Sequence, residues 1–446
     1  MMALSGRRWV IIAAIALVAI AAWPFLGAQR ANATYAYYAP VQPDYVYRDK
    51  TIAFYEKRML QDSQDQISAR ILASQYLQRY RENLDVGDLQ RGLHQGFRSL
   101  QLQPEHNAVA DEVIGSGYYA LHEFRQALTF ESRARSEQSG DPNAPAQMAL
   151  LEMEIGHYAS ARHDLMVAWR IKDDPSVWTA QARYDEMTGN LARAKTLMQR
   201  AAARADEISD NSAESRAWYH YRLGQIAFSA GDSDQAKSQE RIAITDFPGF
   251  EMAYRALARF CWGLKEWQCA LDAAQKGVNI VPEPETLGYL TDAHQALGDV
   301  AAAKATQELI FVVERIGNAY RINDRLLSVY YSEHNVRLDD SLRIARREVA
   351  KRGNEIEAQD TLAWAAAMDG HWTEAYHAML IATHLHTQDP RVLFHAGMIE
   401  EHFGHRARAR QYLKAALDLN PQFDPFYADL ARRTYANSRA EMEYSK

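Results

Sequence analysis

The sequence is short of the residues that mark most catalytic and nucleic-acid-binding chains. Its 446 residues include only two cysteines, 13 prolines and 22 glycines. It has no phosphate loop, dinucleotide-binding glycine fingerprint, nucleophile elbow, HExxH helix or CxxC pair. The formal net charge of -7 and the lack of a long basic run argue against a nucleic-acid footprint. The sequence therefore indicates neither an enzyme of the classes that these motifs mark nor a nucleic-acid-binding protein.

Long apolar runs are equally scarce, because only the N-terminal run approaches membrane-spanning length. An arginine pair at 7–8 precedes the apolar residues 9–26, and Ala31-Asn32-Ala33 offers a small-x-small cleavage site. A run of this length lies between a long signal peptide and a short membrane anchor. We expect residues 1–33 to export the chain to the periplasm or beyond. Cleavage is favoured, with anchoring in the inner membrane by residues 9–26 as the alternative.

The two cysteines, Cys261 and Cys269, are close together in the sequence. In an oxidising compartment such a pair can close a small loop as a disulfide. The alternative is two buried thiols, and the sequence leaves both open.

What the sequence has in abundance is an internal repeat. One short pattern recurs along the chain. It begins with a turn pair such as Gly-Asp or Gly-His, continues with a large apolar residue and two polar residues, and ends with a small residue. Examples are GHYASA (156–161), GNLARA (189–194) and GHWTEA (370–375). Most of the small residues follow one another at a period of about 34 residues, and the interval from Ala194 to Ala236 is the longest. Another small residue often stands twelve residues earlier, where the paired helices would approach closely. The small residues that define the period are Gly92, Ala127, Ala161, Ala194, Ala236, Ala270, Ala303, Ser341, Ala375 and Ala409.

This period resembles the tetratricopeptide repeat, a helix–turn–helix unit of about 34 residues. The resemblance covers roughly residues 67–421 and implies an all-α, right-handed superhelical solenoid of about ten units. Asp174-Pro175 and Asp389-Pro390 agree with it as helix starts, with Asp as N-cap and Pro in the first turn. The longest interval places its extra residues in 204–214, as a longer helix and a polar loop.

The flanks of the array carry their own expectations. Residues 34–66 are predicted to form a Tyr- and Pro-containing linker with a short helix starting in 55–60. Residues 422–446 are predicted to form a capping helix and tail, because an open array end would expose its apolar face. The stretches 48–82 and 389–405 resemble segments of exported bacterial proteins with these repeats, which implies an envelope setting.

A solenoid of this type lines its concave face with the first helix of each unit. Aromatic residues and arginines anchor interfaces, because they bury much area and still offer directed polar contacts. The predicted partner-binding residues are Trp218, Tyr221, Gln225, Phe228, Arg255, Arg259 and Trp262. The alternative for each residue is packing against an adjacent helix.

Histidines crowd the segment HLHTQDPRVLFHAGMIEEHFGH at 384–405. Zinc needs three or four ligands that converge tetrahedrally. The repeat spreads these histidines over several structural features, so that only Glu401, His402 and His405 stay as candidate metal ligands. The alternative is solvated histidines of turns and helices.

The sequence thus predicts a non-catalytic scaffold of the bacterial envelope that binds a protein or peptide partner, without a cofactor and without nucleic acid. Membrane association would come only from the N-terminal segment. Two alternatives stay open. One is a metal-binding or enzyme-accessory protein that uses the His-rich units 371–405, and the other is a structural component of a secretion or polymer-export assembly.

Overall fold

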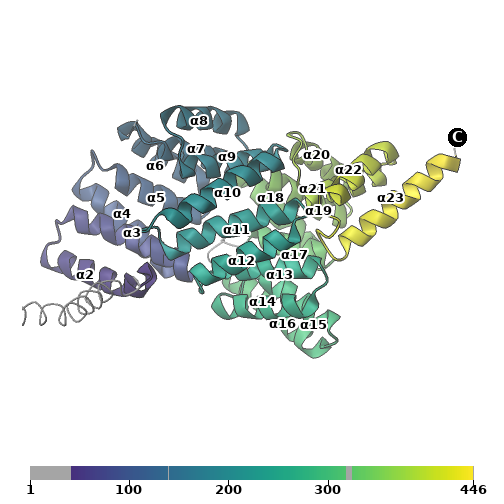
Figure 1. Cartoon of the computed structure of the whole chain (residues 1–446), viewed down its shortest axis with the longest axis horizontal. Helices are drawn as coiled ribbons and strands as arrows, with labels where there is room; N and C mark the ends of the chain where they lie inside the picture. Colours follow the sequence, from purple (N-terminus) through teal and green to yellow (C-terminus); the bar gives the residue numbers. More distant parts are fainter. Residues whose placement is uncertain (1–41, 139, 318–323, 445–446) are drawn as a thin grey trace, which may run out of the picture. The chain divides into compact units, whose positions relative to one another are not determined.

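The computed structural model describes residues 42–138, 140–317 and 324–444. The chain divides into two units, Met1–Tyr47 and Arg48–Lys446. The described part of the first unit is a 3-10 helix, η1 (Asp44–Tyr47). The described part of the second unit contains the α-helices α2 to α23 and no strand (Figure 1). The fold class is therefore all-α, as the repeat predicts.

The predicted export segment, residues 1–33 with its apolar run 9–26, lies outside the described residues. So does the linker up to residue 41. Within the described ranges, no helix combines the length and apolarity that crossing a bilayer requires.

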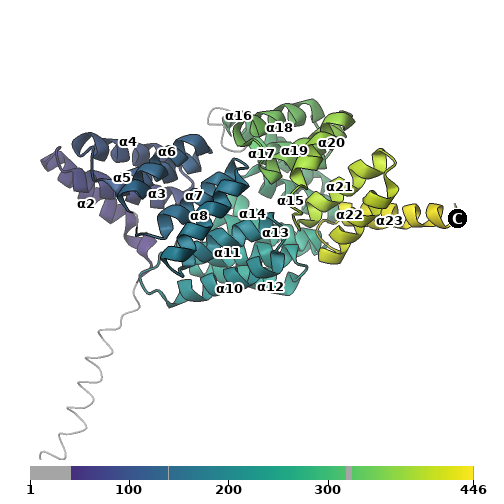
Figure 2. The same cartoon turned by 90° about the horizontal axis from the view of Figure 1, so that it is seen from above.

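Ten helix pairs follow α2 (Arg48–Gln61) and stack one on the next as a solenoid (Figure 2). In chain order the pairs are α3 (Gln66–Asn83) with α4 (Val86–Leu102), α5 (Ala108–Ala120) with α6 (Phe124–Glu137), α7 (Asn143–Glu154) with α8 (Tyr158–Ile171), α9 (Pro175–Met187) with α10 (Leu191–Glu207), α11 (Ala213–Ser229) with α12 (Ser233–Asp246), α13 (Glu251–Gly263) with α14 (Trp267–Ile280), α15 (Pro284–Ala296) with α16 (Val300–Gly317), α17 (Asp324–Glu333) with α18 (Leu338–Arg352), α19 (Ile356–Met368) with α20 (Trp372–Ala382), and α21 (Pro390–His402) with α22 (Arg406–Leu419).

The small residue that defines the repeat lies on the second helix of every pair and is buried there. It faces the small residue of the first helix. In the pair α11 and α12, a Cβ atom on Gly224 would lie 3.2 Å from the carbonyl oxygen of Ala236. Two small residues at this crossing let the helix backbones approach, and each close approach buries apolar surface on both sides.

Helix ends follow the predicted capping chemistry. The carboxylate of Asp174 accepts from the backbone N–H of Ser176, and that of Asp389 accepts from the N–H groups of Arg391 and Val392. At the N-terminal side the helix expected to start in 55–60 begins earlier, at Arg48. At the C-terminal side, α23 (Tyr427–Tyr444) buries Ala428 and Ala431 in one apolar cluster with residues of α21 and α22.

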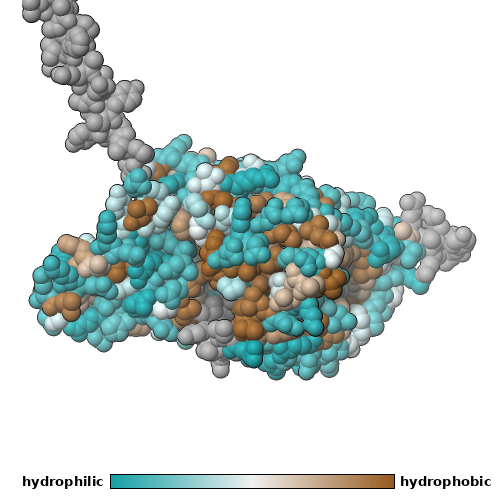
Figure 3. All heavy atoms as spheres, turned by 90° about the horizontal axis from the view of Figure 1, so that it is seen from below, coloured by the Kyte–Doolittle hydropathy of each residue, from teal (hydrophilic) through white to brown (hydrophobic). Residues whose placement is uncertain are grey.

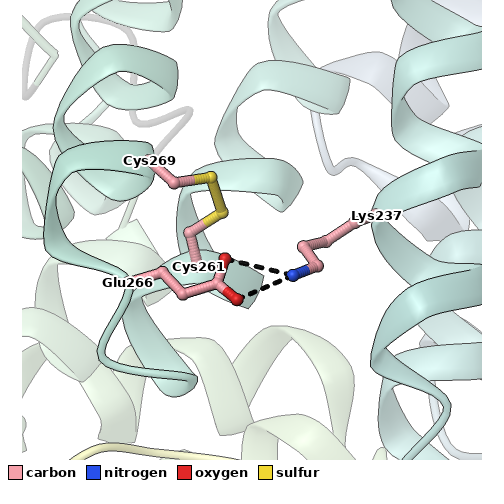
Figure 4. The surroundings of a disulfide bond; sticks show 4 residues. All are labelled: Lys237, Cys261, Glu266 and Cys269. Carbon is pink, nitrogen blue, oxygen red and sulfur yellow. Dashed lines mark hydrogen bonds and ion pairs between the residues drawn. A yellow bond between two sulfur atoms is a disulfide. The ribbon is translucent and has the colours of Figure 1, made fainter.

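Cys261 and Cys269 form a disulfide that joins α13 to α14 within one helix pair (Figure 4). Their Cα atoms are 5.7 Å apart, and Cys261 is fully buried. Beside the disulfide, Glu266 pairs with Lys237 of the preceding unit at 2.8 Å. The structure thus decides for the disulfide over two buried thiols.

Units far apart in the chain also touch, which the repeat period alone does not predict. The hydroxyl oxygen of Tyr158 accepts from the backbone N–H of Ile356 at 3.0 Å. The amide of Asn420 donates to the carbonyl oxygen of Phe228 at 2.7 Å. The turn glycines of the earlier units lie in these contacts, since a Cβ atom on Gly189 would collide with the carbonyl oxygen of His386. The inner side of the solenoid is therefore partly closed by contacts between its early and late units.

Candidate functional site: a charged central cavity

The inner side of the solenoid holds a cavity of about 750 Å³. Its wall consists mainly of first helices, from α3 to α21. Arginines and carboxylates are the most frequent polar residues of this wall. The charged residues of the wall are Glu154, Arg183, Glu186, Arg222, Glu251, Arg255, Arg259, Glu283, Glu285, Arg325, Glu333, Arg352, Glu357, Asp360, Asp389 and Arg391.

Four of the seven predicted partner-binding residues line this cavity: Tyr221, Gln225, Arg255 and Arg259. They occupy equivalent positions of two consecutive first helices, α11 and α13, one repeat apart. Side chains at these positions point inward because every unit repeats the same packing.

The other three predicted residues do not line the cavity. Phe228 is 1% exposed and stacks on Phe260, with 4.4 Å between the ring centroids. The indole of Trp262 is buried and donates to the carboxylate of Asp292 at 2.8 Å. Trp218 packs against the apolar cluster of α9, α10 and α11. These aromatics lie on the faces of the first helix that neighbouring helices cover.

A ladder of ion pairs crosses the cavity wall between distant units. Arg183 contacts Glu357 at 2.7 Å and Glu186 at 3.2 Å. Glu186 also pairs with Arg222 at 2.7 Å, and Glu357 with Arg325 at 3.2 Å. Early and late units are thereby linked through shared carboxylates, which fixes the position of each guanidinium.

The same pattern continues along the wall. Arg255 pairs with Glu285 at 3.3 Å and lies 3.6 Å from Glu251. Arg391 pairs with Glu333 at 3.2 Å. Each of these arginines is half-buried or more, and each has a carboxylate within hydrogen-bonding or ion-pair distance.

The electrostatics keep this wall ionised. Burial alone would lower the pKa of Arg183, but the carboxylates of Glu357 and Glu186 outweigh it and raise the pKa well above the ordinary value. Burial would likewise raise the pKa of Glu357, but Arg183 and Arg325 hold this pKa far below its usual range. Neighbouring charges thus win over desolvation at both partners.

Arg259 is the exception among the arginines of the wall. Its guanidinium donates to the side-chain oxygen of Gln225 at 3.2 Å and lies over the ring of Phe228. In the described part of the chain it forms no ion pair with a carboxylate. Because a guanidinium has five N–H donors, most donors of Arg259 are unused. Arg259 is therefore the cavity cation best placed to bind a carboxylate or a carbonyl group.

A buried histidine stands at the late end of the wall. His395 is 4% exposed, and its Nδ1 lies 2.9 Å from Asp360. Its ring stacks on the indole of Trp364 with 4.3 Å between centroids. Its Nε2 has no hydrogen-bond partner among the described residues. This imidazole is held firmly in place, as a wall group and not as a solvated side chain.

The candidate metal ligands of the late units take separate places. The ring of His402 stacks on Trp372, with 3.6 Å between centroids, and His405 faces Glu400 at 2.6 Å. Together with Glu401 they do not bring three ligand atoms within 4.8 Å of one another. The described residues do contain such groups elsewhere, and one of them consists of Asp206, His220 and Asp246.

Most charged residues of the cavity wall were not predicted from the sequence, although their positions within the repeat indicate that they face inward. Glu285, Glu357 and Arg391 share one position of the first helix, six residues before its close-packing position, and Trp218 stands at the same place in α11. Applying the register to every unit would have placed these charges on the inner face. The pairing of Glu357 with Arg183, in a much earlier unit, has no signature in the sequence.

The outer surface carries apolar residues as well, and Figure 3 shows hydrophobic patches between hydrophilic ones on one face. Exposed large apolar side chains include Leu297 at the end of α15 and Val300, Leu309 and Val312 on α16. α16 also contributes Val313 to the cavity wall, whereas its exposed residues Val300, Leu309 and Val312 do not line the cavity.

Residues 390–423, which contain α21 and α22, match the family model described as tetratricopeptide repeat. The nine preceding helix pairs repeat the same arrangement, with a buried small residue on each second helix. Residues 390–423 are therefore a tetratricopeptide repeat, and the fold is a stack of helix pairs of this type. No curated protein sequence matches it.

Several solved structures are similar to this chain. One is PilW, a widely conserved type IV pilus biogenesis factor, at 16% identity over 46% of this chain and 93% of PilW, with a TM-score of 0.40. Human IFIT1 matches at 15% identity over 67% of this chain and 68% of its own, with a TM-score of 0.44. Yeast Tom70 matches at 12% identity over 88% and 93%, with a TM-score of 0.36. Because all three TM-scores are below 0.5, these likenesses indicate no partner.

Proposed function

We propose that this protein is a non-catalytic scaffold of the bacterial envelope that takes a segment of a partner protein into its central cavity. The observation that carries this proposal is the cavity itself, about 750 Å³ in volume and lined by the first helices of successive units. Cavities of roughly 300–1,000 Å³ hold drug-sized ligands, and a peptide segment of a few residues is of similar size. A folded domain would not fit.

The wall suggests the chemistry of the segment. Arginines and carboxylates alternate, and most are already paired with one another. A strongly acidic or strongly basic segment would have to break these pairs, and each broken pair would leave a desolvated charge. A segment with few charges, held by its backbone carbonyl groups and by one carboxylate at Arg259, meets no such cost.

The envelope setting is supported by two features. The apolar residues 9–26 follow an arginine pair, as in export signals. The disulfide between Cys261 and Cys269 is of the kind that persists in an oxidising compartment such as the periplasm. Neither feature depends on the identity of the partner.

Site-specific photo-crosslinking in cells tests this function. A photoreactive residue at Gln225 faces the cavity, whereas one at Gln275, exposed on α14, faces outward. We expect the Gln225 probe to crosslink a segment that mass spectrometry assigns to one envelope protein, and the Gln275 probe to miss that segment. Adding Arg259→Ala should weaken the crosslink about tenfold or more, because a charged anchor is worth about 1.5–3 kcal/mol.

Arg241→Ala is the matched control, since Arg241 is exposed on α12 and lines no part of the cavity. It should leave the crosslink intact. Equal crosslinking of one protein from Gln225 and Gln275, or insensitivity of the Gln225 crosslink to Arg259→Ala, would contradict binding in the cavity.

A further inference from the structure

The ends of α10 and α12 converge on a histidine of α11, and none of the three residues involved lines the central cavity. The Nε2 atom of His220 lies 3.1 Å from Oδ1 of Asp206 and 3.9 Å from Oδ2 of Asp246. One ligand atom from each of the three residues lies within 4.8 Å of the other two. The helices that carry them lie side by side in both views (Figure 1, Figure 2).

This cluster depends on the one long interval of the repeat. α10 has 17 residues, whereas the equivalent helices α8 and α12 have 14 each. All three begin three residues before their small residue, so the extra residues lengthen α10 at its C-terminal end. Asp206 lies in this added turn. The longer α10 thus places a carboxylate within the helix, beyond the point at which α8 and α12 end.

The orientation of His220 favours a ligand at Nε2. Its side chain is 7% exposed, and its Nδ1 lies 2.7 Å from the side-chain oxygen of Gln239. An Nδ1–H that donates to this oxygen leaves Nε2 as a lone pair directed at two carboxylates. Metal-binding histidines are held in the same way, with the other ring nitrogen donating to an oxygen.

Apart from His220, the two carboxylates have few contacts with basic groups. Oδ2 of Asp246 is buried and makes no hydrogen bond within the described residues. Arg216 is the nearest basic group, but its Nε lies 3.9 Å from the other oxygen of Asp246, and its Nη1 donates to the carbonyl oxygen of Asn211. With the proton of His220 on Nδ1, three acceptor atoms therefore face one point.

The helix ends reinforce the need for a cation. Asp206 lies in the last turn of α10, and Asp246 is the last residue of α12. The C-terminal end of a helix carries partial negative charge, and cations are stabilised there. Both helices thus add to the negative potential at Nε2 of His220.

From this geometry we infer that His220, Asp206 and Asp246 form a site for a divalent transition-metal ion, with Zn²⁺ as the fitting ion. Zinc takes imidazole nitrogen and carboxylate oxygen at about 2.0–2.2 Å in tetrahedral geometry, so ligand atoms around it are roughly 3.3–3.6 Å apart. The 3.1 Å contact has to open and the 3.9 Å contact has to close, each by a few tenths of an ångström. The ion would tie the ends of α10 and α12 to α11. The inference does not depend on the proposed function.

Zinc titration of the full chain, with the disulfide oxidised, tests the site. We expect one Zn²⁺ per chain by equilibrium dialysis and metal analysis. Asp206→Asn should weaken binding at least about tenfold while the fold persists, because this side chain is 50% exposed. Gln239→Ala, which frees the imidazole without removing a ligand, should weaken it about 10- to 100-fold. Co²⁺ bound by the wild-type chain should show visible absorption bands that Asp206→Asn loses.

Glu207→Gln is the matched control, since this neighbouring carboxylate is exposed and pairs with Arg204. It should bind Zn²⁺ as the wild-type chain does. Equal affinity of the wild-type chain and Asp206→Asn would overturn the site. So would the absence of bound Zn²⁺, which would assign the cluster to a protonated His220 between two carboxylates. Loss of the ion in His402→Gln/His405→Gln would place it in the late units instead and would equally overturn the inference.

Discussion

The Cβ atom that Gly224 lacks would collide with Oε1 of Glu240, so the carboxyl group of α12 fills the space that the glycine of α11 leaves. The equivalent pair of the last unit is Gly397 with Leu413, where the Cβ atom would lie 2.7 Å from the leucine side chain. The same space thus accepts a carboxyl group in one unit and an apolar side chain in another.

This relationship predicts that Glu240→Leu stabilises the protein. Glu240 is fully buried, neither of its oxygens has a hydrogen-bond partner among the described residues, and burial raises its pKa well above the ordinary value. A buried polar group without a partner costs about 1–3 kcal/mol. We expect a gain of about that size in urea unfolding. Leu413→Glu, the reverse change at the matched position, should lower stability by at least as much.

A second prediction concerns the glycine of the pair. Gly224→Ala should destabilise the protein by about 1–3 kcal/mol, because an added methyl group overpacks the contact with Glu240. Combining it with Glu240→Ala should restore much of the loss, since the smaller side chain vacates the space. Additive effects of the two changes, measured as a double-mutant cycle, would contradict this contact.

The titration of the Glu131 carboxyl group, on α6, should make the free energy of unfolding depend on pH. Burial, with the nearby carboxylates of Glu112 and Asp111, raises its pKa from 4.5 to about 8. Between these pH values the folded state holds a proton that the unfolded state has lost, so stability falls as the pH rises. The contribution is complete below about pH 4.5 and is lost as the pH reaches about 8, with a slope of up to about 1.4 kcal/mol per pH unit.

Unfolding midpoints measured from about pH 5 to about pH 8 check this prediction. Glu131→Gln should flatten the slope, because the amide does not titrate. Glu123→Gln, an exposed carboxyl group just before the same helix, should leave the slope as it is. A slope that Glu131→Gln does not change would assign the pH dependence to other groups.

The helix pairs could be predicted from the sequence because they depend on contacts within a single repeat unit. The small residues, the turn glycines and the Asp-Pro starts each specify a local conformation, and ten repetitions make the pattern unmistakable. The disulfide could be proposed but not decided, because the choice between a bond and two thiols depends on compartment and geometry together.

The cavity could not be predicted from the sequence, because it depends on contacts between distant units. The path of a solenoid is the sum of small rotations between neighbouring units, so a small change per unit decides whether Tyr158 meets Ile356 or misses it. The pairing of Arg183 with Glu357 depends on that sum. The sequence also does not decide whether Phe228 and Trp262 point into the cavity or toward another helix. A first helix is apolar both on the side of its paired helix and on the side of the neighbouring units.

The last prediction tests these contacts between distant units with two glycines of the same conformation. Gly189 and Gly370 are both turn glycines, with φ of +79° and +82°. A Cβ atom at Gly189 would meet the carbonyl oxygen of His386, whereas one at Gly370 would meet nothing within 4 Å. Alanine at either position costs about 1–2 kcal/mol for its left-handed backbone. Gly189→Ala should cost roughly 1–3 kcal/mol more, because it also forces the two turns apart.

Hydrogen exchange shows where this extra cost falls. In Gly189→Ala we expect faster exchange in the late units near His386 and around the cavity wall, at positions far from the change in the sequence. Gly370→Ala should raise exchange only in its own helix pair, α19 and α20. Equal destabilisation by the two variants, with exchange confined to the substituted pair in both, would mean that the contact between early and late units contributes nothing to the folded state. The cavity would then lack the closure that holds Arg183 against Glu357.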